Sequence, residues 1–185
     1  MMKLNAKQLR KLKVNPSTSL EARSKKLKVK KQEIYIVLDN VLDTYNIGSI
    51  FRLADAVAAK KVYLCGETET PPNHRIKKAS INTTEIVEWE YFSTAVEAIK
   101  NLKFKIQNLT IVAIEQSKKS VQYDKFQYTL PICLVVGHET KGVSKEVLDI
   151  ADGIVEIPMF GVNKSLNVMV SLAIVLYKVA EECLP

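Results

Sequence analysis

The sequence predicts an α/β fold in which a mostly parallel sheet is flanked by helices. Over residues 32–185, short runs of β-branched residues alternate with segments of helical periodicity. Several of the runs are almost entirely apolar, as in Ile132–Val136. Strands of this kind are typical of a parallel sheet whose two faces are both covered. A chain of 185 residues is long enough for one such domain and a short extension.

Six runs rich in β-branched and other apolar residues are the predicted strands. They are Glu33–Leu38, Lys61–Cys65, Ile86–Trp89, Leu109–Ile114, Ile132–Val136 and Ile154–Ile157. Between and after them lie segments with apolar residues at the three- and four-residue spacing of a helix. The predicted helices are Ile47–Ala59, Ser93–Leu102, Ser144–Ile150 and Ser165–Glu182.

The predicted closing helix is apolar around nearly its whole circumference. The first charged residue after Ser165 is Lys178. Such a helix is either buried or part of a subunit interface, and the sequence pattern alone favours the core. One apolar stripe consists of Leu166, Val170, Ala173, Ile174 and Tyr177, and the other positions are Val168, Leu172, Val175, Leu176 and Val179.

Basic residues are concentrated at the start of the chain. Residues 1–31 contain eleven Lys or Arg and one acid, whereas the remaining residues contain sixteen basic and nineteen acidic side chains. We therefore divide the chain into a basic extension, residues 1–31, and a nearly neutral domain, residues 32–185. Such an extension suits contact with an RNA phosphate backbone. On charge alone, a solvated tail that keeps the protein soluble is an equally good interpretation.

The chain has three cysteines, with no CxxC pair, and two histidines. This pattern predicts neither a disulfide framework nor a metal site, and it suits a reducing compartment. The sequence lacks the apolar core of a signal peptide and any apolar run of about 18 residues. We expect a cytoplasmic protein without a membrane partner, with a mitochondrial presequence as the alternative for the lysine-rich start.

The glycine pattern excludes two common nucleotide-binding loops. No GxGxxG follows the first strand, so the Rossmann fingerprint is missing. Gly137 and Gly142 have the spacing of a phosphate-binding loop, but Val143-Ser144 follows where that loop needs Lys-Ser/Thr. Neither class of nucleotide site is therefore expected.

Three segments each begin at the end of a predicted strand and run into a helix, where open α/β sheets bind their ligands. They contain NIGSIFR (46–52), GHETKGV (137–143), and IPM (157–159) followed by SLNV (165–168). Together they resemble, in order and spacing, the motifs N-x-G-[SA]-I-x-R, G-x-E-x-x-G-V and I-P-M with S-L-N-V of the SpoU (TrmH) family of RNA 2′-O-methyltransferases, in the SPOUT superfamily. The resemblance covers about residues 33–182.

The resemblance implies a deep trefoil knot in the C-terminal half, with S-adenosyl-L-methionine bound there largely by main-chain groups. It also implies a homodimer whose active site lies at the subunit interface. The expected reaction is methyl transfer to a ribose 2′-hydroxyl of tRNA or rRNA. Two alternatives remain: a knotted RNA-binding protein without catalysis, and a related enzyme that methylates a base nitrogen.

By resemblance, the catalytic residues are Arg52, Asn46, Glu139, Ser165 and Asn167. A guanidinium remains protonated and is a poor base, so we expect Arg52 to hold phosphate and the reacting hydroxyl while the proton leaves to phosphate or water. Glu139 is expected to fix the geometry of the site through Arg52. Asn46 and Ser165 are also natural helix N-caps, and each can serve in both ways.

The expected cofactor-binding residues are Ile114, Gly137, Ile157, Met159 and Leu166. Gly137 would let the cofactor approach the main chain, and the other four would contribute main-chain contacts. Their side chains look like core. Two positions differ from many family members, since Met169 replaces a small residue and His138 occupies a variable site.

Overall fold

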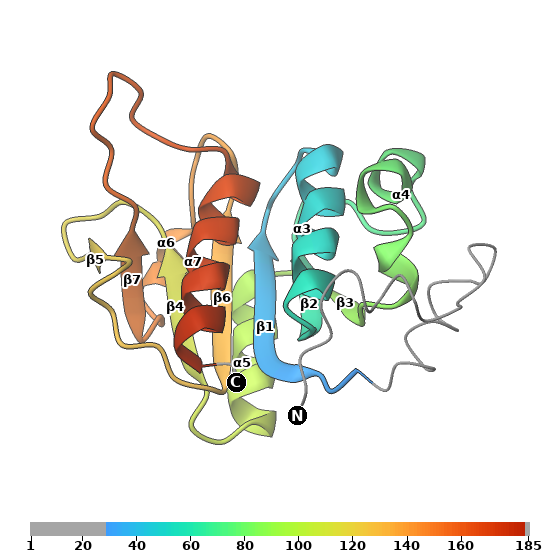
Figure 1. Ribbon diagram of the computed structural model, residues 1–185, viewed down its shortest axis with the longest axis horizontal. Helices are drawn as coiled ribbons and strands as arrows, with labels where there is room; N and C mark the ends of the chain where they lie inside the picture. The colour runs from blue at the N-terminus through green and yellow to red at the C-terminus, as the bar shows by residue number, and fades with distance from the viewer. Residues whose placement is uncertain (1–28, 184–185) are drawn as a thin grey trace, which may run out of the picture.

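The computed structural model describes residues 29–183. The predicted basic extension therefore lies outside the described residues, except for its last three positions. Within the described part, the strands form one sheet in the order β3-β2-β1-β6-β4-β7-β5 (Figure 1). Every pairing in this sheet is parallel, which confirms the predicted fold class.

The strands are β1 Gln32–Asp39, β2 Ala59–Cys65, β3 Trp89–Phe92, β4 Thr110–Ile114, β5 Val121–Gln122, β6 Ile132–Gly137 and β7 Gly153–Glu156. The helices are α3 Thr44–Ala56, α4 His74–Ser80, α5 Ala95–Lys105, α6 Lys145–Leu148 and α7 Val168–Cys183, with the 3-10 turn η1 Thr83–Glu85.

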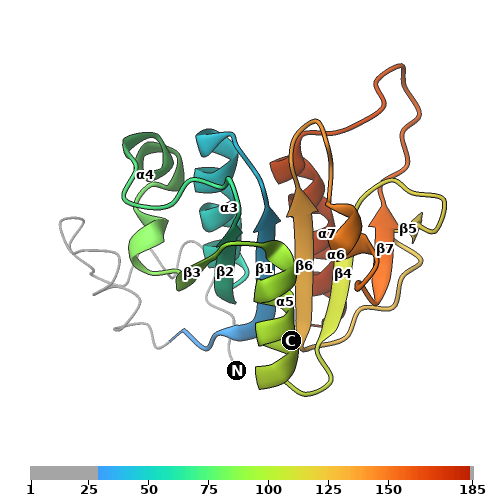
Figure 2. The same cartoon turned by 180° about the vertical axis from the view of Figure 1, so that it is seen from behind.

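Helices cover both faces of the sheet. The helices α3, α4 and α7 lie on one face, and α5 and α6 lie on the other (Figures 1 and 2). Alternate residues of β1 accordingly enter different cores: Ile36 packs in the cluster that includes α3 and α7, while Val37 packs in the cluster that includes α5. This two-sided burial explains why the central strands are apolar at nearly every position.

The two central strands send their following helices to opposite faces. The strand β1 leads into α3, whereas its neighbour β6 leads into α6 on the other face. The two strands end together, with Asp39 opposite Gly137. In open α/β sheets such a divergence opens a crevice at the carboxyl ends of the strands. The first two sequence motifs meet there.

The starts of two helices differ from the sequence prediction. Asp43 caps α3 by accepting a hydrogen bond from the N–H of Tyr45, so Asn46 lies inside the first turn. Asn167 caps α7, because its side-chain oxygen accepts from the N–H of Met169 at 2.9 Å. The N-cap interpretations of Asn46 and Ser165 were therefore wrong.

Other differences lie where local signals are weak. The predicted strand Ile86–Trp89 begins three residues later, because the chain first makes η1 and buries Val87. The helix α4 and the two-residue strand β5 were not predicted from the sequence. No helix within residues 29–183 combines the length and apolar character needed to cross a membrane.

The closing helix is buried on one face only. Its inner face is formed by Leu172, Val175, Leu176 and Val179, all fully buried. The predicted apolar stripe lies largely on the outer face, where Val170 is 37% exposed and Tyr177 is 54% exposed. The core interpretation of this helix is therefore confirmed for its inner face only, since much of the stripe is accessible in the single chain.

Candidate active site

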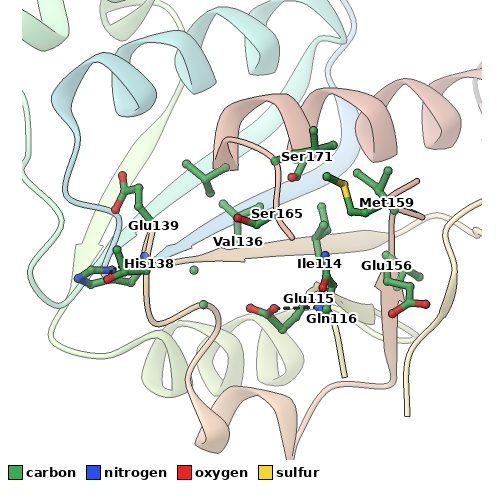
Figure 3. Close-up of a pocket in the computed structure, with 17 residues that line it drawn as sticks. Ile114, Glu115, Gln116, Val136, His138, Glu139, Glu156, Met159, Ser165 and Ser171 are labelled. Carbon is green, nitrogen blue, oxygen red and sulfur yellow. Dashed lines mark hydrogen bonds between the residues drawn. The ribbon is translucent and has the colours of Figure 1, made fainter. Parts of the chain in front are cut away.

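A cavity of about 180 Å³ lies at the carboxyl ends of β4, β6 and β7 (Figure 3). Three segments that are distant in the sequence form its walls: the end of β4, the loop after β6, and the loop between β7 and α7. All five residues expected to bind the cofactor line this cavity: Ile114, Gly137, Ile157, Met159 and Leu166. Of the expected catalytic residues, Glu139 and Ser165 line it too.

The loop after β6 folds back on itself. The main chains of His138 and Gly142 exchange hydrogen bonds of 3.1 and 2.8 Å. A Cβ atom at Gly137 would lie 2.2 Å from the carbonyl of Gly142, and Gly142 itself has φ +72°. Glycine at 137 is therefore required by the loop's own closure, in addition to any approach by a cofactor.

Glu139 connects this loop to the start of α3. One carboxylate oxygen accepts from the main-chain N–H of Asp43 at 2.9 Å and from the side-chain amide of Asn46 at 3.1 Å. The other accepts from the N–H of Leu42 at 3.1 Å. Burial opposes ionisation, but these hydrogen bonds outweigh it and lower the pKa of Glu139 below 4.5. The ionised carboxylate also complements the positive end of the helix dipole.

Asn46 extends the connection to the third motif. The side-chain amide of Asn167 donates to the side-chain oxygen of Asn46 at 3.0 Å. Glu139, Asn46 and Asn167 therefore form one hydrogen-bonded chain across all three motifs. Asn46 is only 5% exposed, so its amide depends on these partners for hydrogen bonding.

Arg52 lies apart from this network. It is exposed on α3, it does not line the cavity, and no hydrogen bond or ion pair among residues 29–183 involves it. Within the single chain, Glu139 binds the start of α3, and its expected action through Arg52 stays a prediction. One turn before Arg52, a Cβ at Gly48 would lie 2.5 Å from the Cβ of Ala79, so the glycine lets α3 pack closely on α4.

Among the cavity residues that were not expected from the sequence are Glu115 and Gln116, which directly follow β4. Their position after a predicted strand was the only available signal, because they belong to none of the three motifs. Three carboxylates line the cavity, from Glu115, Glu139 and Glu156, and none of the lining residues that the structure describes is lysine or arginine. The cavity thus favours a ligand with positive charge.

The sequence profile of the SpoU rRNA Methylase family matches residues 33–177. The chain belongs to this family. The assignment confirms the resemblance drawn from the motifs, and the match covers every residue of the cavity and of the hydrogen-bonded chain described above.

Individual SpoU relatives resemble the chain over most of its length. It is 36% identical over 167 residues to a tRNA (guanosine(18)-2′-O)-methyltransferase of Aquifex aeolicus, covering 86% of this chain and 76% of that protein. The crystal structure of the A. aeolicus TrmH/SpoU tRNA modifying enzyme superposes with a TM-score of 0.77, at 32% identity, over 88% of this chain and 83% of that one. The AdoMet-bound rRNA methyltransferase of Sinorhizobium meliloti gives a TM-score of 0.74 at 27% identity, over 82% of this chain and 57% of that one.

Proposed function

We propose that this chain is an S-adenosylmethionine-dependent RNA (ribose-2′-O)-methyltransferase acting on tRNA or rRNA. The observation that carries the proposal is the cavity in which all five expected cofactor-binding residues come together. The hydrogen bonds that Asn46 donates to Glu139 and Asn167 donates to Asn46 join this cavity to two further motif residues. The A. aeolicus relative is named as a tRNA 2′-O-methyltransferase, which supports the same reaction class.

The cavity residues fit the cofactor. When bound, S-adenosylmethionine would supply a methyl group carried on a positively charged sulfur. The surrounding carboxylates favour that charge over a neutral or anionic ligand. The main-chain groups of Ile157, Met159 and Leu166, together with the end of β4 at Ile114, would hold the adenine side.

The substrate hydroxyl must be oriented and must lose its proton, because a ribose hydroxyl is a poor nucleophile. Ser165 lines the cavity and would face the substrate. Arg52 would grip an RNA phosphate and orient the hydroxyl through its fork of donors, with the proton leaving to phosphate or water. Asn46 and Asn167 would hold the first and third motifs in place for this step.

We infer that two copies of the chain pair to complete the site. Arg52 lies outside the cavity of its own chain, which supports a site completed by the arginine of a partner copy. The outer face of α7 and the loop before it also carry exposed apolar side chains that a second copy would cover. These are Phe160, Val162, Leu166, Val170 and Tyr177.

Oligomeric state and subunit mixing test this pairing. Val170→Glu should convert the dimer to a monomer in analytical ultracentrifugation and lower methyl transfer. Mixing Arg52→Ala chains with chains that cannot bind cofactor should restore part of the activity, since a mixed dimer keeps one intact site. Mixtures that remain inactive would show that Arg52 does not act across the interface.

The trefoil knot also belongs to this proposal. Support comes from the path of the chain: β7 lies beyond β4 in the sheet, yet α7 returns to pack on β6 and α3 (Figure 1). A chain trace in a crystal structure tests the threading. We also propose a cytoplasmic location, a reducing compartment in which the thiols of Cys65, Cys133 and Cys183 would stay free.

The decisive experiment maps 2′-O-methylation across total RNA with and without the protein. Mass spectrometry of the digested nucleosides should detect a 2′-O-methylated ribose that depends on the chain. A methylated base would instead support the base-nitrogen alternative. Absence of any methyl transfer, together with absence of cofactor binding by calorimetry, would support an RNA-binding protein without catalysis.

A further inference from the structure

Glu115 connects the end of β4 to the loop of the second motif. One oxygen of its carboxylate accepts from the main-chain N–H of Val143 at 2.8 Å, and the other accepts from the N–H of Gln116 at 2.8 Å. The first oxygen occupies the space beside Gly142, where a Cβ atom would lie 2.0 Å away from it. The lack of a side chain at Gly142 therefore lets the Glu115 carboxylate reach this loop.

Gln116 connects the same strand end to the loop of the third motif. Its side-chain amide donates to the carbonyl of Lys164 at 2.7 Å. Within the described chain this is the only hydrogen bond made by residues 157–166, and residues 160–166 are all exposed. Three of the expected cofactor contacts, Ile157, Met159 and Leu166, belong to this loop.

These two neighbouring residues thus hold both loops that enclose the cavity, and Figure 3 shows them side by side beneath Ile114. A loop that is already held in its binding geometry loses less conformational freedom when a ligand binds, so the ligand binds more tightly. Main-chain contacts depend especially on such positioning, because a main-chain group moves only with its loop.

We propose that Glu115 and Gln116 are positioning residues that set the affinity for S-adenosylmethionine by holding the two loops together at the end of β4. This inference rests on the proposed function of the cavity. It assigns to these side chains no part in the methyl transfer itself, and it therefore separates cofactor affinity from the rate of the chemical step.

Calorimetry with S-adenosylmethionine on the chain of residues 1–185 tests the proposal. Glu115→Ala should raise the Kd of the cofactor about tenfold, the factor expected for one charge-assisted hydrogen bond, and Gln116→Ala should raise it about fivefold. Glu90→Ala is the matched control. It removes a carboxylate on β3 that accepts a hydrogen bond from the ammonium of Lys61, on the neighbouring strand β2, at 2.8 Å. This change should leave the Kd of the cofactor unchanged.

Conservative variants and kinetics separate positioning from a general structural role. Glu115→Gln keeps one oxygen able to accept from Val143 and should recover part of the affinity. Gln116→Glu places a carboxylate against the carbonyl of Lys164 and should bind no better than Gln116→Ala. In methyl transfer, the alanine variants should raise KM for the cofactor while kcat and KM for RNA stay within about twofold of the unaltered chain.

Amide hydrogen exchange gives an independent readout, because Glu115→Ala should speed exchange at the N–H of Val143. The proposal is overturned if the alanine variants bind cofactor as tightly as the unaltered chain. It is also overturned if they lower kcat with KM unchanged. If the unaltered chain itself does not bind S-adenosylmethionine, the proposed function fails, and this result is distinct from the other two.

Discussion

Replacing Glu139 with alanine removes the acceptor of three hydrogen bonds that join the second motif to the start of α3. The main-chain N–H groups of Leu42 and Asp43 lie near the surface, where water can replace the lost oxygen. The Asn46 amide is only 5% exposed and would lose a partner inside the protein. An unsatisfied buried group costs about 1–3 kcal/mol and each exposed bond contributes less, so we expect a total loss of about 3 kcal/mol in the free energy of unfolding.

Urea unfolding at pH 7, followed by circular dichroism and extrapolated linearly to water, measures this loss. Glu146 is an exposed acid on α6 and supplies the control, because Glu146→Ala should change the free energy by less than about 0.5 kcal/mol. A Glu139→Ala chain as stable as this control would refute the view that the carboxylate holds the motifs together.

The same carboxylate predicts a pH dependence with a defined sign. The pKa of Glu139 is lowered from 4.5 in the folded chain, so its contribution to stability is fully present above about pH 4.5 and is lost as the pH falls through the folded value. The stability difference between the unaltered chain and Glu139→Gln should therefore be largest near neutrality and shrink below pH 4.5. A difference that grows on acidification would contradict the assignment.

Arg52→Ala should lower methyl transfer about a hundredfold or more while cofactor binding in calorimetry stays unchanged, and Arg52→Lys should not restore it, because lysine lacks the planar fork. Asn167→Asp keeps the oxygen that caps α7 but loses the amide that donates to Asn46. It should lower the rate in methyl-transfer assays strongly and the melting temperature in thermal unfolding only slightly. Gly48→Ala would place a methyl group 2.5 Å from Ala79 and should cost about 2 kcal/mol in urea unfolding. Deleting residues 1–31 should weaken RNA binding and flatten its salt dependence in filter-binding titrations, with cofactor affinity unchanged.

The fold class and the convergence of the cavity residues could be predicted because both depend on runs that are continuous in the sequence. Runs such as Ile132–Val136 are apolar at every position, as expected for a strand of a parallel sheet that is buried on both faces. The residues that line the cavity follow predicted strands, and parallel strands bring their carboxyl ends to one edge. Ile114, Gly137 and Ile157 therefore converge, although they are 23 and 20 positions apart along the chain.

The helix starts could not be predicted as reliably, because several capping residues compete locally. Asp43 and Asn46 both suit an N-cap, and so do Ser165 and Asn167. What decides between them is tertiary: Asn46 is drawn into the interior by Glu139 and Asn167, which are 93 and 121 residues away. No local pattern contains those partners, so a reading of periodicity and capping preferences selects the wrong residue.

Which face of the closing helix is buried could not be predicted for a related reason. Its two apolar faces are indistinguishable by composition, and only the packing of Leu172, Val175 and Leu176 against the sheet shows which face is inside. The stripe with Val170 and Tyr177 is left outside. A helix that is apolar on both sides therefore predicts two packing surfaces, one against its own chain and one against another molecule.

The residues that line the cavity and the exposed Arg52 would serve two different parts of the proposed reaction, cofactor binding and substrate orientation. The cavity walls come from residues 114–171 of one chain, whereas Arg52 lies on α3 outside them. Cofactor binding would then depend mainly on the fold of each protomer, and substrate orientation on the pair. If the proposed pairing holds, it obeys mass action, and turnover per chain would fall on dilution below the Kd of the pair. A regulator that acts at the exposed face of α7 would thus change turnover without entering the cofactor cavity.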